Sequence, residues 1–284
     1  MPAQKSTTVS CHVSAFPAVA VNVRFAWHHV AARYWRTCLS LSLAISLPAS
    51  ASENIIIAVA TNFLQTAQSL RSEFQRIDAE RIRLVSGSTG KLYAQIIQGA
   101  PFHLYLAADQ ARPLRLEEQG LVMKGSRQTY AIGKLALWAP QQSRLPHDTS
   151  IPSLLQSIKF RKLAVANPNL APYGIATIET LKSLQLYDEV KLRLVFGENI
   201  GQTLSLVATG NAEIGFVAVS SISRIRNREK GALLHVHPGL HGPIRQDSAI
   251  LLSGKHNTTA HRFNEFPHGP HGRKIIRRAG YEVD

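Results

Sequence analysis

From residue 53 onward, short apolar runs alternate with longer stretches in which apolar residues recur at helical spacing. A strand is predicted at residues 54–60, because every residue from Ile55 to Ala60 is apolar, which is typical of a strand buried on both faces of a parallel sheet. In the next stretch, apolar side chains lie three and four positions apart, which predicts an amphipathic helix with one buried stripe. The residues of this stripe are Phe63, Leu64, Ala67, Leu70, Phe74 and Ile77.

The same alternation continues along the chain and predicts an α/β fold with largely parallel strands. Pro267 falls inside a helical pattern, where proline costs about 3 kcal/mol, so the helix there should end early. The further strands are predicted at 82–86, 104–108, 135–139, 162–166, 192–196, 213–217 and 249–252. Helices are predicted at 89–98, 112–119, 172–184, 201–209, 219–226, 261–266 and 272–279.

The order of these elements predicts two lobes. The strand at 249–252 and the last two helices follow a second complete α/β unit, so we expect them to return to the first lobe. Residues 53–132 plus 246–284 then form a discontinuous lobe 1, and residues 133–245 form lobe 2. In such an arrangement, ligands bind in the cleft where strand ends and helix starts converge.

Small polar residues follow the first two strands, where a helix begins. They are Thr61-Asn62 and Ser86-Gly87-Ser88-Thr89-Gly90, and comparable turns lie at 167–174 and 197–203. The first turn of a helix has free N–H donors and a partial positive charge, so it favours an anion. One such turn is more often ordinary capping, but four of them in a two-lobed chain predict an oxyanion site built from neutral donors.

The sequence lacks the catalytic motifs that would indicate an enzyme. A phosphate-binding loop at residues 87–91 would need glycine and a hydroxyl residue where Val85 and Leu92 stand. The sequence contains neither a G-x-S-x-G elbow nor an H-E-x-x-H motif. We therefore expect no catalytic residues, no cofactor and no metal site on the histidines, although an enzyme on a similar two-lobed fold remains an alternative. Those histidines are His235, His237, His241, His268 and His271.

Residues 1–52 have the pattern of an N-terminal extension that ends in a signal peptide. A basic flank at 33–36 precedes the apolar run 38–47 and the small residues 48–52. We expect cleavage near residues 51–53 and a periplasmic protein, with an uncleaved membrane anchor as the alternative. Both cysteines, Cys11 and Cys38, fall in this segment, so the mature chain would have none.

The net charge of +14 raises nucleic acid or an anionic membrane as partners. Residues 1–52 carry four of the basic residues and no acidic residue, so part of the excess would leave with the signal peptide. The chain has neither an aromatic RNA-binding motif nor a recognition-helix signature. We therefore expect no nucleic-acid partner.

Several segments together resemble the periplasmic molybdate-binding proteins that feed ABC transporters, over residues 53–284. They are residues 60–63, 86–90, 98–101 with 107–109, 130–135, 171–174, 215–218 and 275–281. The resemblance implies a type II periplasmic-binding-protein fold and a monomer that captures molybdate or tungstate for a membrane permease. Molybdenum would be present only as the bound oxyanion.

The resemblance also implies which residues bind the anion. Thr61, Asn62, Thr89 and the neighbouring Ser88 match donors of lobe 1, and the backbone N–H groups of Tyr173 and Ile200 match donors of lobe 2. Ala218 stands where some members carry a tyrosine hydroxyl, which implies the branch that uses Asn62 instead.

The chemistry of the predicted shell fits a fully deprotonated dianion. Burial of such an anion requires hydrogen bonds in place of its hydration. Phosphate near neutral pH keeps a proton and needs an acceptor, and it is disfavoured because this shell has hydroxyls and amides but no carboxylate. Another oxyanion such as sulfate stays an alternative, because its exclusion depends on the size of the cavity.

Overall fold

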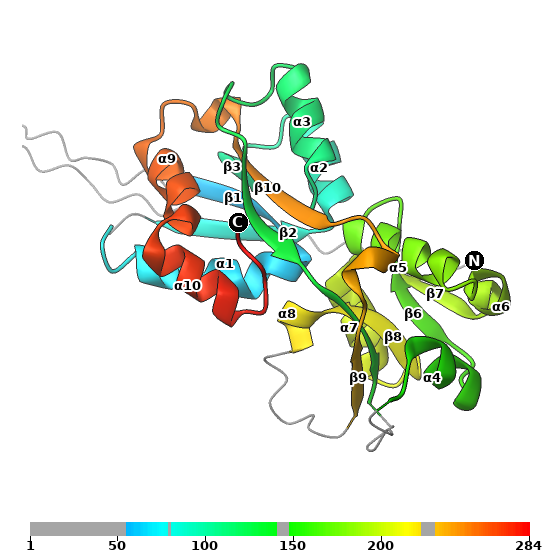
Figure 1. Cartoon of the computed structure of the whole chain (residues 1–284). Coiled ribbons are helices and arrows are strands. Elements are labelled where there is room, and N and C mark those ends of the chain that lie inside the picture. Colours follow the sequence, from blue (N-terminus) through cyan, green and yellow to red (C-terminus); the bar gives the residue numbers. More distant parts are fainter. Residues whose placement is uncertain (1–54, 79–80, 141–147, 223–230) are drawn as a thin grey trace, which may run out of the picture. The chain divides into compact units, whose positions relative to one another are not determined.

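Two five-stranded sheets organise the part of the chain that the computed structural model describes, which is residues 55–78, 81–140, 148–222 and 231–284 (Figure 1). The predicted signal peptide and its cleavage site lie outside the described residues. Within the described residues, no helix has the length and apolar character needed to cross a membrane.

The first sheet is mixed. Strand β1 runs parallel to β2 and β3, whereas β10 runs antiparallel to both β3 and β4. A strand from near the C-terminus therefore lies between two strands from the first half of the chain. In sheet order the strands are β2 (Ile82–Gly87), β1 (Ile55–Ala60), β3 (Leu104–Leu106), β10 (Ile244–Ile250) and β4 (Gln128–Gly133).

The second sheet repeats this arrangement. Strand β6 is parallel to β7 and β8, and β5 is antiparallel to β8 and β9. The predicted α/β class is confirmed, but the expectation of largely parallel strands is wrong for β10 and β5. In sheet order the strands are β7 (Leu194–Gly197), β6 (Leu163–Ala166), β8 (Ile214–Ala218), β5 (Leu135–Ala139) and β9 (Ala232–His235).

Two segments join the sheets. The chain leaves the first sheet at Gly133, the last residue of β4, and enters the second at Leu135, the first residue of β5. It returns between β9 and β10, through a 3-10 turn at Pro238–Leu240. We call the residues around Gly133 and the start of β10 the crossover segments.

Helices cover both sheets. They are α1 (Leu64–Phe74), α2 (Thr89–Ile97), α3 (Ala111–Glu118), α4 (Ile151–Ser157), α5 (Pro172–Ser183), α6 (Tyr187–Val190), α7 (Ile200–Ala208), α8 (Val219–Ile222), α9 (Thr258–Glu265) and α10 (Pro270–Arg278). Short 3-10 turns include η1 (Thr61–Phe63) and η5 (Phe266–His268).

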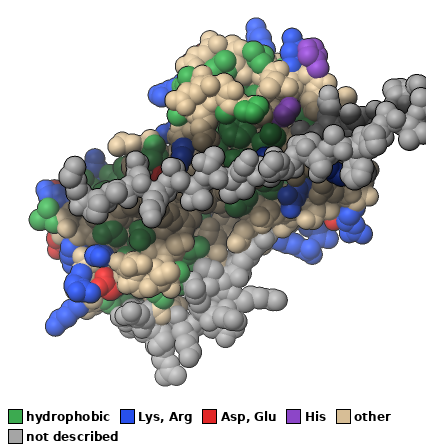
Figure 2. Space-filling model, turned by 180° about the vertical axis from the view of Figure 1, so that it is seen from behind, with side chains coloured by type: hydrophobic (Ala, Val, Ile, Leu, Met, Phe, Trp, Pro, Cys, Tyr) green, Lys and Arg blue, Asp and Glu red, His purple; other side chains and the backbone are tan. Residues whose placement is uncertain are grey.

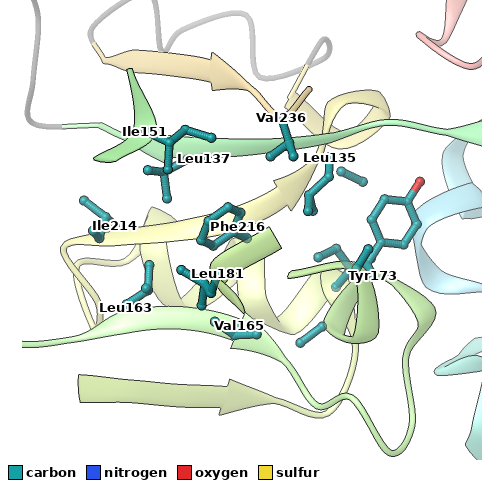
Figure 3. Close-up of a cluster of buried hydrophobic side chains, with 14 of the residues drawn as sticks. Leu135, Leu137, Ile151, Leu163, Val165, Tyr173, Leu181, Ile214, Phe216 and Val236 are labelled. Carbon is teal, nitrogen blue, oxygen red and sulfur yellow. The ribbon is translucent and has the colours of Figure 1, made fainter. Parts of the chain in front are cut away.

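The core explains why β1 is apolar throughout. Ile57 and Val59 pack into one cluster with α1, α9 and α10, while Ala58 packs into another with α2 and α3. All three side chains are fully buried, as the continuous apolar run predicts. The second sheet has its own cluster around Phe216, Leu137 and Val165 (Figure 3).

Some predicted boundaries are wrong for identifiable reasons. Helix α1 ends at Phe74, so Ile77 leaves the predicted stripe and is 67% exposed. Leu192 lies before β7 and is also exposed. Strand β10 begins at Ile244 rather than at residue 249. The sequence analysis missed β4, β9, α4 and α6, and residues 223–226 of the helix predicted after β8 lie outside the described residues.

The expectation at Pro267 is confirmed. Helix α9 ends at Glu265, and Pro267 lies in the 3-10 turn η5 that follows. Proline has no N–H to donate to the preceding turn, so the α-helical pattern stops before it.

His268, in η5, predicts a loss of stability in mild acid. Burial is the main cause that lowers its pKa, aided by Arg273 and opposed by Glu265, and its Nε2 is buried without a hydrogen-bond partner in the described structure. The unfolded chain therefore takes up this proton first as the pH falls below about 6.5, and stability declines from there. His268→Gln should make the melting temperature less dependent on pH between about pH 7.5 and 5.5. The control is His256→Gln, at an exposed histidine, which should leave the pH dependence of the melting temperature as in the wild type. The same pH dependence in the wild type and in both variants would contradict the prediction.

Candidate functional site

The starts of four helical segments meet where the two sheets adjoin. The N–H of Gly90, in the first turn of α2, donates to the carbonyl of Leu170 before α5 at 2.9 Å. A β-carbon on Gly201, in the first turn of α7, would lie 2.4 Å from Cγ2 of Thr61 in η1. Turns that follow β1 and β2 of the first sheet therefore contact turns that follow β6 and β7 of the second.

Charged side chains surround these turns in neutralised pairs. Lys91 Nζ lies 3.1 Å from Glu198 Oε1, which links α2 to the turn before α7. Arg112 pairs with Asp109 and also donates to the carbonyl of Asn169 at 3.0 Å. The sequence analysis named neither Lys91 nor Arg112 as a functional residue, although the three-residue spacing from Asp109 to Arg112 at the start of α3 is typical of an ion pair.

The hydroxyls of Ser88 and Thr89 are buried and each accepts a hydrogen bond. Ser88 caps α2, with its Oγ accepting from the N–H of Lys91 at 3.3 Å. Thr89 Oγ1 accepts from the N–H of Ala108 at 3.2 Å. Because both hydroxyls act as acceptors in these bonds, their own hydrogens are left to donate to a further partner.

The side chains of Thr61 and Asn62 already donate within the protein. Thr61 Oγ1 donates to the carbonyl of Gly87 at 2.9 Å. Asn62 Nδ2 donates to Gln246 Oε1 at 2.8 Å and to the Tyr281 hydroxyl at 3.1 Å. A contact from the Asn62 amide to an anion would have to replace one of these two hydrogen bonds.

Tyr173 and Ile200 lie in the first turns of α5 and α7. Pro172 is the first residue of α5, and a β-carbon on Gly174 would lie 2.2 Å from the carbonyl oxygen of Ala166, so this turn packs directly on the end of β6. Asn199 caps α7 by accepting from the N–H of Gln202 at 2.9 Å. The N–H groups of Tyr173 and Ile200 are among those that a helix leaves without an internal acceptor.

Comparison with known proteins agrees with this arrangement. Residues 55–282 match the family described as bacterial extracellular solute-binding protein. The chain belongs to this family. Its members are solute-binding proteins rather than enzymes, and the α/β fold predicted from the sequence is confirmed.

Two relatives of this solute-binding protein are each named molybdate-binding protein ModA. That of Azotobacter vinelandii is 37% identical and covers 87% of this chain and 96% of its own length. The relative from Rhodobacter capsulatus is 36% identical and covers 87% of this chain and 95% of its own length. The solved structure of an Azotobacter vinelandii periplasmic molybdate-binding protein superposes with a TM-score of 0.75 at 34% identity, over 81% of this chain and 99% of that one. The resemblance drawn from the motifs is confirmed.

The solute-binding protein also contains a buried polar cluster that the sequence analysis missed. We call it the tyrosine–amide cluster. Its residues are Asn62, Tyr130, Tyr173, Gln246 and Tyr281, each no more than 5% exposed. Burial is the main cause that raises the pKa of Tyr130 and Tyr173 well above that of a free phenol. Both phenols are therefore neutral hydrogen-bonding groups that add no negative charge beside the helix starts.

One cavity of the described structure lies beside the helix starts, and another lies away from them. One of about 220 Å³ is lined by residues on either side of the site, among them Ala108, Asp109 and Pro172. A larger one of about 530 Å³ lies between α1, α9 and α10 and is lined by Phe74, Ile77 and Phe266. None of the six predicted anion-binding residues lines either cavity, and the described residues contain no group of three His, Cys, Asp or Glu side chains placed to hold a metal ion.

Proposed function

We propose that this protein is an extracytoplasmic receptor that captures molybdate or tungstate and delivers it to the membrane permease of an ABC transporter. The observation that carries the proposal is the meeting of the first turns of η1, α2, α5 and α7, at the turns that the sequence predicts for an oxyanion. The names of the two relatives at 37% and 36% identity support molybdate as the ligand.

Neutral donors would replace the hydration of the anion. The Thr89 and Ser88 hydroxyls and the N–H groups of Tyr173 and Ile200 supply hydrogen bonds, and the helix starts supply partial positive charge. The nearby ions are paired, Lys91 with Glu198 and Arg112 with Asp109, so they leave no net charge that would hold the anion irreversibly. Beyond this site, Lys and Arg exceed Asp and Glu on the face shown in Figure 2, which favours the approach of anions.

Lobe closure would couple binding to delivery. In this proposal, residues 53–132 plus 246–284 form lobe 1 and residues 133–245 form lobe 2, and the anion stabilises their contact because each lobe supplies part of the shell. The receptor acts as a periplasmic monomer after cleavage near residues 51–53, without a cofactor and without catalysis. The crossover segments would bend as the lobes separate.

Calorimetric titration of the mature protein tests this proposal. We expect molybdate and tungstate to bind with similar affinity, and sulfate and phosphate to bind far more weakly. Tight sulfate binding with weak molybdate binding would support the other oxyanion receptor instead. Mass spectrometry of the protein purified natively from the periplasm should show a bound molybdenum or tungsten oxyanion and a new N-terminus near residue 52. Absence of binding to every oxyanion tested would refute the proposal.

Thr89→Val should weaken molybdate binding by about 10- to 150-fold, the loss expected for one hydrogen bond to a charged group. Valine keeps the shape of threonine but removes the hydroxyl, so it also leaves the N–H of Ala108 without its acceptor. Thr89→Ser is the matched control, because it keeps the hydroxyl and should bind close to the wild type. Equal affinities for the valine and serine variants would remove Thr89 from the site.

A further inference from the structure

The backbone and the side chain of Tyr173 lie in different surroundings. Its backbone N–H lies in the first turn of α5, at the proposed anion site, while its ring packs at the edge of the core of the second sheet. Figure 3 shows the phenol oxygen pointing away from the other labelled side chains of that core. The oxygen reaches Gln246, whose Nε2 donates to it at 3.5 Å.

The phenol contacts both crossover segments. A β-carbon on Gly133 would lie only 2.2 Å from the Tyr173 oxygen and 2.8 Å from Gln246 Nε2. Gly133 ends β4 and pairs with Ile244, the first residue of β10, two positions before Gln246. The absence of a side chain at residue 133 therefore makes the space that the phenol occupies, at the place where the chain passes between the sheets.

Gln246 connects this phenol to η1. Its Oε1 accepts from Asn62 Nδ2 at 2.8 Å and from the Tyr130 hydroxyl at 3.2 Å. The Tyr281 hydroxyl in turn donates to the backbone carbonyl of Asn62 at 2.8 Å. Buried hydrogen bonds thus run from the first turn of α5, through the crossover segments, to the first helical turn after β1. Apart from Asn62, which is itself one of the predicted anion donors, these side chains act on the site without contacting the anion.

We propose that Gln246 and the phenol of Tyr173 are positioning residues, which hold the first turn of α5 in the anion-binding arrangement with η1, and that Gly133 provides the space for the phenol. This inference rests on the proposed function. Separation of the two sheets at the crossover segments withdraws the phenol from Gly133 and breaks its hydrogen bond to Gln246. The tyrosine–amide cluster therefore stabilises the same arrangement that the anion requires.

Tyr173→Phe is the sharpest test, because it removes one oxygen and keeps both the ring and the backbone N–H. We expect molybdate affinity to fall by about 3- to 10-fold, the loss of one neutral hydrogen bond, mainly through faster release. A merely structural role would lower the melting temperature of the ligand-free protein and leave affinity unchanged. Tyr93→Phe is the control, because that hydroxyl accepts a weak, 3.4 Å hydrogen bond from Gln119 in an exposed position and lies outside the tyrosine–amide cluster.

Gly133→Ala should weaken binding more, by about 5- to 150-fold, because its methyl group occupies the place of the phenol oxygen. The double variant Gly133→Ala/Tyr173→Phe should lose less affinity than the product of the two single losses, since phenylalanine leaves more room for the methyl group. Gly242→Ala is the control glycine, where a β-carbon would be an ordinary 3.6 Å from Glu179.

The outcomes separate this inference from the proposed function. If the wild type binds molybdate and Tyr173→Phe binds equally well, or if the losses of the double variant simply multiply, the positioning role is overturned and the proposed function stands. If the wild type binds none of the oxyanions, both are overturned. Weaker binding by Tyr173→Phe together with non-multiplicative losses supports the inference.

Discussion

Gly201→Ala should weaken molybdate binding by about 5- to 150-fold, the range expected for one added methyl group in a closely packed contact. Alanine is a better helix former than glycine, so the isolated α7 would be stabilised. The added carbon would nevertheless lie 2.4 Å from Cγ2 of Thr61, across the contact between α7 and η1. The substitution therefore opposes the arrangement in which the helix starts meet and should leave the rest of the protein folded.

A second substitution should restore binding to this variant. Thr61→Ser removes Cγ2 and keeps the hydroxyl, and the next atoms from the new methyl group would then be Asn199 Oδ1 at 3.2 Å and Cβ of residue 61 at 3.7 Å. Calorimetry of Gly201→Ala, Thr61→Ser and the double variant measures the effect. Failure of Thr61→Ser to recover affinity in the Gly201→Ala background would show that this contact does not limit binding.

Arg127→Ala should lower the free energy of unfolding by about 3 kcal/mol, the cost of leaving a buried carboxylate without its cation. Asp247 is fully buried in β10, and its Oδ2 lies 2.7 Å from Arg127 Nη1. Thr129 Oγ1 still donates to Asp247 at 2.6 Å and Gln110 Nε2 at 3.2 Å, so we expect the lower end of the range for broken buried pairs. Urea unfolding of the mature protein measures the change.

Arg161→Ala is the matched control for this prediction. Arg161 also pairs with a carboxylate, Glu213, but its side chain is 92% exposed. Exposed ion pairs contribute about 0–1 kcal/mol, so its loss should be small. Arg127→Ala/Asp247→Asn should be more stable than Arg127→Ala, because the uncompensated charge is gone. Equal stability of the Arg127→Ala and Arg161→Ala variants would mean that Asp247 does not depend on Arg127.

Apolar patterning predicted most of the strands and helices, and the return of β10 to the first sheet, but not where β10 begins. Gln246, Asp247 and Ser248 are fully buried in the middle of this strand, so its first half has no apolar run to recognise. Their burial is tolerated because partners distant in sequence satisfy them, including Asn62 for Gln246 and Arg127 for Asp247. Such partners are set by the fold and carry no local signal.

The residues of the candidate site were likewise predicted only in part. The turns after the strands predicted that Thr89, Tyr173 and Ile200 stand at helix starts, and each does. Their role as anion donors stays a prediction. The tyrosine–amide cluster could not be predicted, because Asn62 lies 184 residues from Gln246 and 219 from Tyr281. Contacts over such distances follow from sheet order, and the return of β10 into the first sheet was predicted only roughly.

The position of β10 also sets when the first sheet can be completed. Strand β4 ends at Gly133, but β10, which separates it from β3, begins only at Ile244. A nascent chain that stops short of residue 244 leaves one edge of β3 and one of β4 with unpaired backbone groups. The first sheet therefore cannot be completed until the chain beyond residue 244 has been made. In the exported receptor that we propose, this order would delay the completion of the first sheet until most of the chain has been synthesised.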